Sequence, residues 1–146
     1  MTFVVPFDGA ERTRTALDRA REFGAALDEE VLVVTVIPVG NAAYARQRGW
    51  LASDEPFDLE TVVSTLRAQV AELAPDATFE YERIDRSVSG NSIAKPIRKF
   101  AKRNDADMVF VGSDNAGRLL TPASSVGGRI ATDGAYDVVL VRSGAP

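Results

Sequence analysis

The sequence predicts an α/β protein with a mostly parallel β-sheet. Apolar runs of strand length alternate with segments of helical periodicity along the 146 residues, which gives the order βαβαβαβαβ. Parallel strands in such an order are joined by right-handed crossovers. With 45% apolar residues and a mean hydropathy near zero, the chain is expected to form one globular domain over residues 1–146.

Five segments have the composition of β-strands. Residues 31–37, VLVVTVI, are almost all apolar and β-branched, as in a central strand that is covered on both faces. Residues 78–84, TFEYERI, alternate apolar with charged side chains, which suits the edge of a sheet. The other strands are predicted at 3–5, 107–112 and 136–142.

Four helices are predicted between these strands. The second spans residues 59–73, the third begins at a cap formed by Asn91 or Ser92 with Pro96 in its first turn, and the fourth follows Thr121. The first helix is recognised by an apolar stripe at i, i+3, i+4 and i+7 spacing. This stripe consists of Ala16, Leu17, Ala20, Phe23, Gly24 and Leu27.

One connection is much longer than the roughly 2 to 6 residues usual for such loops. It runs from Pro38 to Asp58, and residues 41–48 within it have the pattern of a short helix. The segment holds three aromatic residues and two arginines, Tyr44, Trp50, Phe57, Arg46 and Arg48. It forms either a lid or partner surface, or an insertion whose aromatic side chains pack onto the body.

Composition excludes several functions. The sequence has no Cys and no His, which removes disulfides, thiolate nucleophiles, the commonest metal ligands and the commonest general base. We therefore expect no enzyme and no metal site. The net charge of −4 argues against binding to nucleic acid or an anionic membrane, and the N-terminus has no leader pattern, so a cytoplasmic protein is expected.

The balance of charged residues also bears on the source. Arg outnumbers Lys by 14 to 3 in a chain with 21 acidic residues. This bias is expected of a halophile or of a GC-rich genome, and the composition leaves both open. Folding stability that stayed the same between low and molar salt would exclude the halophile hypothesis.

Candidate ligand-binding residues follow three of the predicted strands. In open α/β sheets, ligands bind beyond the carboxyl ends of the strands where the strand order reverses. Asp8, which follows the first strand, can accept hydrogen bonds from a ribose hydroxyl or an adenine amino group, or it can cap the first helix. Gly112 opens a Ser- and Gly-rich loop before a predicted helix, an arrangement that favours anions but also occurs in simple connectors.

Motifs for other phosphate-binding sites are missing. The sequence contains no GxxxxGK[ST] pattern and no GxGxxG after its first strand. A phosphoacceptor domain is excluded as well, because Asp8 has no second acid beside it and no Lys follows Val141.

Four stretches together resemble the universal stress protein family, UspA-like. They are VVPFDGAERTRTALDRA, VLVVTVIPV, VSGNSIAKPIRKFAKRNDADMVFVGS and SSVGGRIATDGAYDVVLVR, and they cover nearly all of the chain. The resemblance implies a Rossmann-like open five-stranded parallel sheet with strand order 3-2-1-4-5 and helices on both faces. It also implies a homodimer that pairs through the last strand, Val138–Val141.

The resemblance further implies where a nucleotide would bind. Family members that hold ATP or AMP carry G-x-x-G, eight or nine residues, then G-[ST], and Mg²⁺ enters only with the nucleotide. Here Gly112 matches the first glycine and Ser125 the final hydroxyl, whereas Asn115 and Ser124 replace the other two glycines. The adenine-side acid falls on Asp8. The expected site is completed by Pro6, Val36, Val111 and Val126.

The two replacements leave the function open. Asn tolerates the left-handed conformation well, but a side chain at Ser124 hinders close approach of a phosphate. One lost backbone donor would weaken ATP binding about 10- to 100-fold. Three functions remain: a nucleotide-binding stress protein, a family member that acts through its dimer and interaction surfaces without nucleotide, and a slow ATP hydrolase using Asp8 or Asp114.

Overall fold

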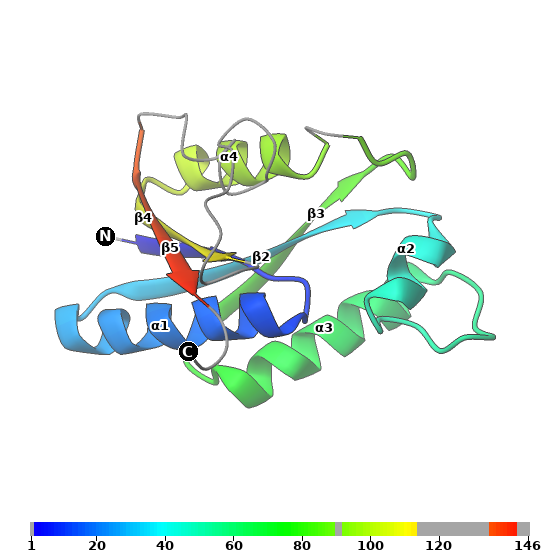
Figure 1. The fold of residues 1–146 in the computed structure, drawn as a ribbon, viewed down its shortest axis with the longest axis horizontal. Coiled ribbons are helices and arrows are strands. Elements are labelled where there is room, and N and C mark those ends of the chain that lie inside the picture. Colours follow the sequence, from blue (N-terminus) through cyan, green and yellow to red (C-terminus); the bar gives the residue numbers. More distant parts are fainter. Residues whose placement is uncertain (1, 90–91, 114–134, 143–146) are drawn as a thin grey trace.

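The protein, analysed as a computed structural model, contains one five-stranded parallel sheet with the order β3-β2-β1-β4-β5 (Figure 1). The structure describes residues 2–89, 92–113 and 135–142. Fold class and strand order are therefore as predicted, whereas the helix expected after Thr121 lies outside the described residues. In chain order the elements are β1 (Thr2–Pro6), α1 (Glu11–Leu27), β2 (Glu30–Pro38), α2 (Ala42–Gln47), α3 (Leu59–Leu73), β3 (Thr78–Ile84), α4 (Ala94–Arg103), β4 (Ala106–Ser113) and β5 (Asp137–Arg142).

The central strand β1 separates the two halves of the sheet. It pairs with β2 through Val4 and Leu32 and with β4 through Val4 and Val109, both in parallel. The chain passes outward from β1 to β2 and β3 on one side, then crosses to β4 and β5 on the other. The strand order therefore reverses between β1 and β4.

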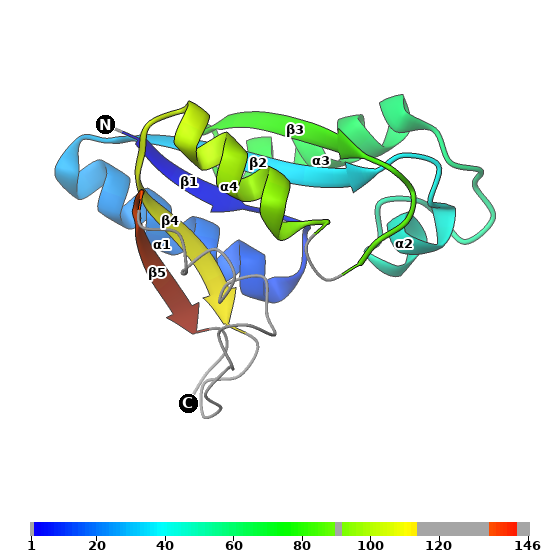
Figure 2. The same ribbon diagram turned by 90° about the horizontal axis from the view of Figure 1, so that it is seen from above.

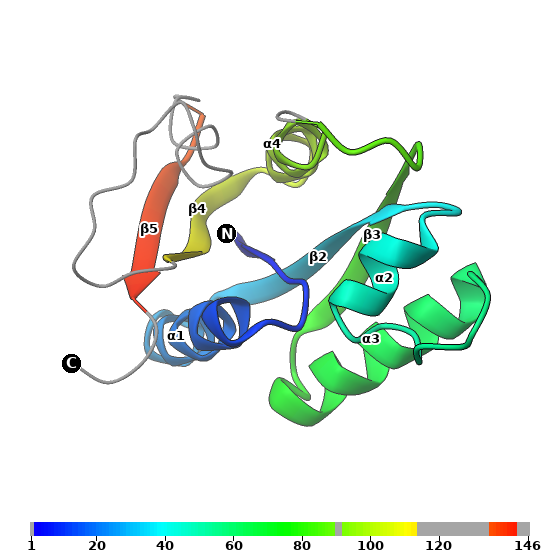
Figure 3. The same ribbon diagram turned by 45° about the vertical axis from the view of Figure 1, so that its right-hand side comes forward.

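Helices cover both faces of the sheet, as Figures 2 and 3 show. Because side chains alternate along a strand, Phe3 and Val5 of β1 pack in the core with α1 and α3, while Val4 packs on the opposite face with α4. The alternation also holds in β3, where Phe79 and Tyr81 join the first core and Ile84 the second. Each face of the sheet thus has its own apolar core.

The apolar stripe predicted for the first helix is buried only in part. Ala16, Leu17, Ala20 and Gly24 are buried, and Phe23 meets the ring of Phe110 edge-on at 5.5 Å although it is partly exposed. Leu27, however, is 55% exposed. It is the last residue of α1, and the chain turns away at Asp28, whose φ is +56°, so Leu27 lies at the end of the packed stripe.

The predicted cap of the third helix is wrong for Ser92. Helix α4 begins at Ala94 after Ile93, and no side chain caps it. The Ser92 hydroxyl instead exchanges hydrogen bonds with the main chain of Ser89, at 2.7 and 2.9 Å. Asn91 lies outside the described residues, and Pro96 falls in the first turn as expected.

The two edge strands of the sheet expose different kinds of side chain. β3 exposes charged side chains, as predicted from its alternation. β5 exposes Leu140, which is 56% accessible.

In the ranges that the structure describes, no helix is long and apolar enough to cross a bilayer.

Candidate functional site

The carboxyl ends of β1 and β4 bring predicted site residues to one edge of the sheet. Pro6 ends β1 and Asp8 follows it, while Val111 and Gly112 lie near the end of β4. Val36 lies in β2, two residues beyond the position that pairs with Pro6. Because the strand order reverses here, this edge is where the fold favours a ligand.

Asp8 is held by groups from the beginning of α1. Its Oδ1 accepts hydrogen bonds from the Ala10 N–H and the Thr13 hydroxyl, both at 2.9 Å. Its Oδ2 accepts a longer bond of 3.3 Å from Arg12, and the Arg48 Nε is 4.0 Å away. The side chain is 20% exposed. One carboxylate oxygen is thus committed to the local turn, and the other makes only long contacts.

Asp8 does not cap α1, so the alternative prediction of a capping role is wrong. The N-cap of α1 is Ala10, and no side chain caps it. Asp8 lies two residues earlier and binds the N–H of that N-cap residue, which orders the turn through Gly9 into the helix. This turn needs a glycine, because Gly9 has a φ of +88°.

The long insertion packs onto the body beside Asp8. The Trp50 side chain is 2% exposed, and its indole Nε1 donates a 2.8 Å hydrogen bond to the Asp8 carbonyl oxygen. Tyr44 and Trp50 meet edge-on at 5.7 Å, and Phe57 packs against the same core. The short helix and the packing interpretation are both confirmed. The insertion therefore lies beside Asp8 at the carboxyl edge of the sheet.

Arg48 connects the insertion electrostatically to Asp8. Its guanidinium lies 3.5 Å above the centre of the Tyr44 ring, and its Nε is buried without a hydrogen-bond partner among the described residues. Burial raises the pKa of Tyr44 above its ordinary value of 10.0, and the positive charge of Arg48 partly offsets that rise. Two arginines and one carboxylate thus meet at this edge.

Gly112 has a structural role that needs no ligand. A Cβ at this position would lie 2.4 Å from the carbonyl oxygen of Arg12, which is closer than atoms can approach. The absence of a side chain lets β4 lie directly against the first turns of α1. The missing side chain at Gly112 therefore permits a close approach to the protein's own backbone.

The remaining predicted site residues divide into two groups. Val36 and Val111 are buried on the α4 face of the sheet, in the core that also contains Ala94 and Ile97. The phosphate side of the predicted site lies outside the described residues. It consists of Asn115, Ser124, Ser125 and Val126.

Sequence reasoning missed four neighbours of Asp8. Arg12 and Thr13 had a usable signal, because they lie only four and five positions after Asp8, in the first turn of the helix that follows it. Arg48 and Trp50 had none, since they lie 40 or more residues away in the sequence. Within the described parts of the chain, no group of three or more acidic, His or Cys side chains could hold a metal ion.

A sequence model of the Universal stress protein family matches residues 1–142. The chain belongs to this family. A search of the curated proteins finds no match. The family assignment therefore rests on the sequence model, which covers every element described above.

Solved structures of this family have the same fold. Universal stress protein UspA from Lactobacillus plantarum is 15% identical, with 97% of each chain covered and a TM-score of 0.64. A universal stress protein from Archaeoglobus fulgidus is 22% identical, covers 97% of this chain and 98% of its own, and has a TM-score of 0.63. A third universal stress protein, solved in complex with cAMP, is 22% identical over 99% of this chain and 98% of its own, with a TM-score of 0.60.

Proposed function

We propose that this universal stress protein is a cytoplasmic stress-response protein that binds an adenine nucleotide, ATP or AMP, at the crevice between β1 and β4. The observation that carries the proposal is the reversal of strand order between these strands, with Asp8 after one and Gly112 in the other. Two structural neighbours support it, one in complex with cAMP and one, from Archaeoglobus fulgidus, with dAMP.

Asp8 is proposed to recognise the nucleoside through its Oδ2. Oδ1 is occupied by Ala10 and Thr13, whereas Oδ2 has contacts of 3.3 and 4.0 Å, at or beyond the long end of hydrogen bonding. A ribose hydroxyl or an adenine amino group can therefore donate to Oδ2 without breaking the turn. The exposed fraction of Asp8 leaves room for such a contact.

Charge at this edge also favours a phosphate-bearing ligand. Arg12 and Arg48 both approach Asp8, so the three side chains together carry one net positive charge. The loop after β4, with Asn115, Ser124 and Ser125, would then hold the phosphates, as the resemblance to the family implies. Mg²⁺ would enter only with the phosphates, because it is usually bound through substrate phosphates and few carboxylates.

The proposed activity is binding without catalysis. The sequence has neither His nor Cys, so it lacks the commonest general base and any thiol nucleophile. We also propose that the protein forms a homodimer. β5 is an edge strand with the exposed Leu140, and pairing of two such edges would form a homodimer through Val138–Val141.

A second function is favoured by a different observation. Asp8 and Gly112 both have structural roles that need no ligand, the first in the turn before α1 and the second against Arg12. A family member that has lost nucleotide binding would keep these residues for folding alone. Such a protein would act through its dimer and interaction surfaces.

Calorimetric titration separates the two functions. We expect ATP with Mg²⁺, or AMP, to bind the wild-type protein, and Asp8→Asn to weaken binding about tenfold by removing the charged acceptor. Asp76→Asn is the matched control, because Asp76 is exposed and precedes β3 at the opposite edge of the sheet.

The thermal stability of each variant is measured in parallel. No heat of binding at millimolar nucleotide, in both low and molar salt, would discard nucleotide binding and leave the second function. A loss of stability in Asp8→Asn with unchanged nucleotide affinity would restrict Asp8 to its role in the turn.

A further inference from the structure

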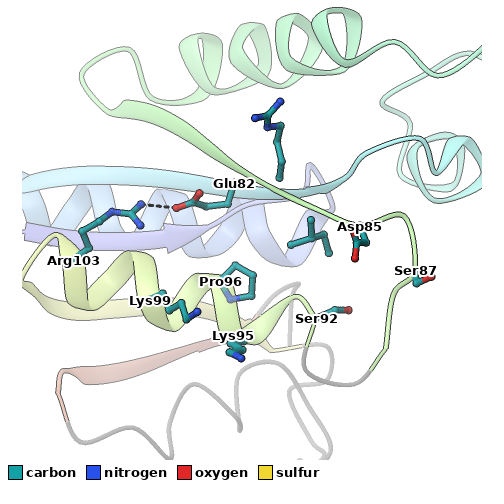
Figure 4. Close-up of a pocket in the computed structure, with 10 residues that line it drawn as sticks. Glu82, Asp85, Ser87, Ser92, Lys95, Pro96, Lys99 and Arg103 are labelled. Carbon is teal, nitrogen blue, oxygen red and sulfur yellow. Dashed lines mark hydrogen bonds and ion pairs between the residues drawn. The ribbon is translucent and has the colours of Figure 1, made fainter.

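A cavity lies between β3 and α4 (Figure 4). Its volume is about 390 Å³, within the range of roughly 300 to 1,000 Å³ typical of small-molecule sites. All the residues that line it lie between Glu82 and Arg103, so none belongs to β1, β4 or α1. This cavity is therefore built by other elements than the proposed nucleotide site.

Helix α4 presents cations to this cavity. Lys95, Lys99 and Arg103 follow each other at four-residue spacing and so share one side of the helix. Arg103 is engaged, because it forms an ion pair with Glu82 of β3. Lys95 and Lys99 are exposed, and neither ammonium has a hydrogen bond or ion pair among the residues that the structure describes. Two unpaired positive charges, one helical turn apart, thus line one wall.

The concentration of cations in α4 is unusual for this chain. Ten residues, AKPIRKFAKR, contain five cations and no acid, and they include all three lysines of the sequence. The whole chain nevertheless has a net charge of −4. The N-terminus of α4, where the N-cap residue Ile93 makes no side-chain cap, adds positive partial charge at the same end as Lys95.

The other end of the cavity has a different chemistry. Asp85 and Ser87, which follow β3, supply a carboxylate and a hydroxyl that can bind the O–H groups of a ligand. Ile84 and Pro96 add apolar surface to the lining. Figure 4 shows Asp85 and Ser87 on the segment after β3 and Lys95 and Lys99 on α4, across the cavity from it.

We propose that this cavity binds a small phosphorylated polyol, with its phosphate at Lys95 and Lys99 and its hydroxyls at Asp85 and Ser87. Lysine ammoniums bind phosphate as point charges, and two of them can share one dianion. The acids Glu82 and Asp85 disfavour a polyanion such as nucleic acid, which would bring further phosphates next to them. The ligand is therefore a small molecule with one phosphate group.

Titration with ribose 5-phosphate, ribose and inorganic phosphate tests the proposal. We expect ribose 5-phosphate to bind the wild-type protein, inorganic phosphate to bind more weakly, and ribose not to bind. Lys99→Gln and Lys95→Gln should each weaken ribose 5-phosphate about five- to tenfold. Lys102→Gln is the matched control, because Lys102 lies on the same helix, carries the same charge and does not line the cavity.

Two further variants test where in the structure the ligand binds. Asp85→Asn should weaken ribose 5-phosphate while leaving inorganic phosphate unchanged or bound more tightly. Asp8→Asn should leave ribose 5-phosphate binding unchanged, which separates this cavity from the proposed nucleotide site. The proposal is overturned by no saturable binding at millimolar ribose 5-phosphate, by an equal loss in Lys102→Gln, or by loss of binding in Asp8→Asn. Unchanged melting temperatures of the Lys variants would establish that their fold is intact.

Discussion

The indole Nε1 of Trp50 donates a hydrogen bond to the carbonyl oxygen of Asp8, 42 positions earlier in the chain. This bond joins the insertion between β2 and α3 to the end of the central strand. It also places Tyr44 and Arg48 beside the Asp8 carboxylate. The insertion is consequently part of the candidate site rather than a surface appended to the fold.

Trp50→Phe should destabilise the protein by about 1 to 3 kcal/mol. The substitution removes the indole donor, leaves the part-buried Asp8 carbonyl oxygen without this partner, and creates space around the smaller ring in the position of the buried Trp50. Urea unfolding followed by circular dichroism measures the change. Phe57→Leu serves as the comparison, because Phe57 packs against the same core and makes no hydrogen bond with its ring. Equal stability of Trp50→Phe and wild type would refute a structural role for the bond.

Gly112→Ala should destabilise the ligand-free protein by about 1 to 3 kcal/mol. The added Cβ would collide with the Arg12 carbonyl oxygen, so β4 and α1 would have to move apart. Gly49→Ala is a useful contrast, because a Cβ there meets nothing within 4 Å and only the left-handed backbone, with a φ of +77°, opposes it. Denaturant unfolding of both variants without nucleotide tests this. If Gly112→Ala lowers the free energy of unfolding less than Gly49→Ala does, steric contact with α1 is not the reason that this position needs a glycine.

Stability should fall at high pH in a way that depends on Tyr44. Burial raises the pKa of Tyr44 in the folded protein above the ordinary value of 10.0, so the folded state holds this proton more tightly than the unfolded state. The resulting stabilisation is fully present below pH 10 and is lost as the pH rises through the folded pKa. The free energy of unfolding of wild type minus that of Tyr44→Phe, measured from pH 8 to 11.5, should decrease above pH 10. A difference that stays flat over this range would contradict the prediction.

The proposed dimer depends on the β5 edge. Leu140→Lys places a charge on an apolar edge strand and should convert a dimer into monomers, because charged edges resist strand pairing. Leu27→Lys is the control, since Leu27 is equally exposed but lies at the end of α1. Light scattering coupled to size-exclusion chromatography gives the mass of each species. A monomeric wild-type protein, or a dimeric Leu140→Lys variant, would exclude pairing through this edge.

Much of the fold could be predicted because the signals for it are local. The continuous apolar run of β2 and the alternation of β3 are properties of neighbouring residues, and both strands fall within one residue of the predicted limits. Helix α3 also has the limits predicted for it, Leu59–Leu73, whereas the beginning of α4 was harder to predict. Ser92 has the right side chain for a cap, but a turn with Ser89 uses its hydroxyl before the helix begins.

Local patterns along the chain were enough to predict the order of the described elements, the edge position of β3, and the places of Asp8 and Gly112 at the carboxyl ends of their strands. The contacts of these two residues depend on the tertiary structure. Arg48 and Trp50 reach Asp8 from the insertion, and Gly112 meets the backbone of a helix 100 positions earlier. Periodicity along the chain records which face of an element is buried, but it carries no information on which distant residue fills the space beside it. Only the packing of α1 and the insertion against the ends of β1 and β4 supplies those neighbours.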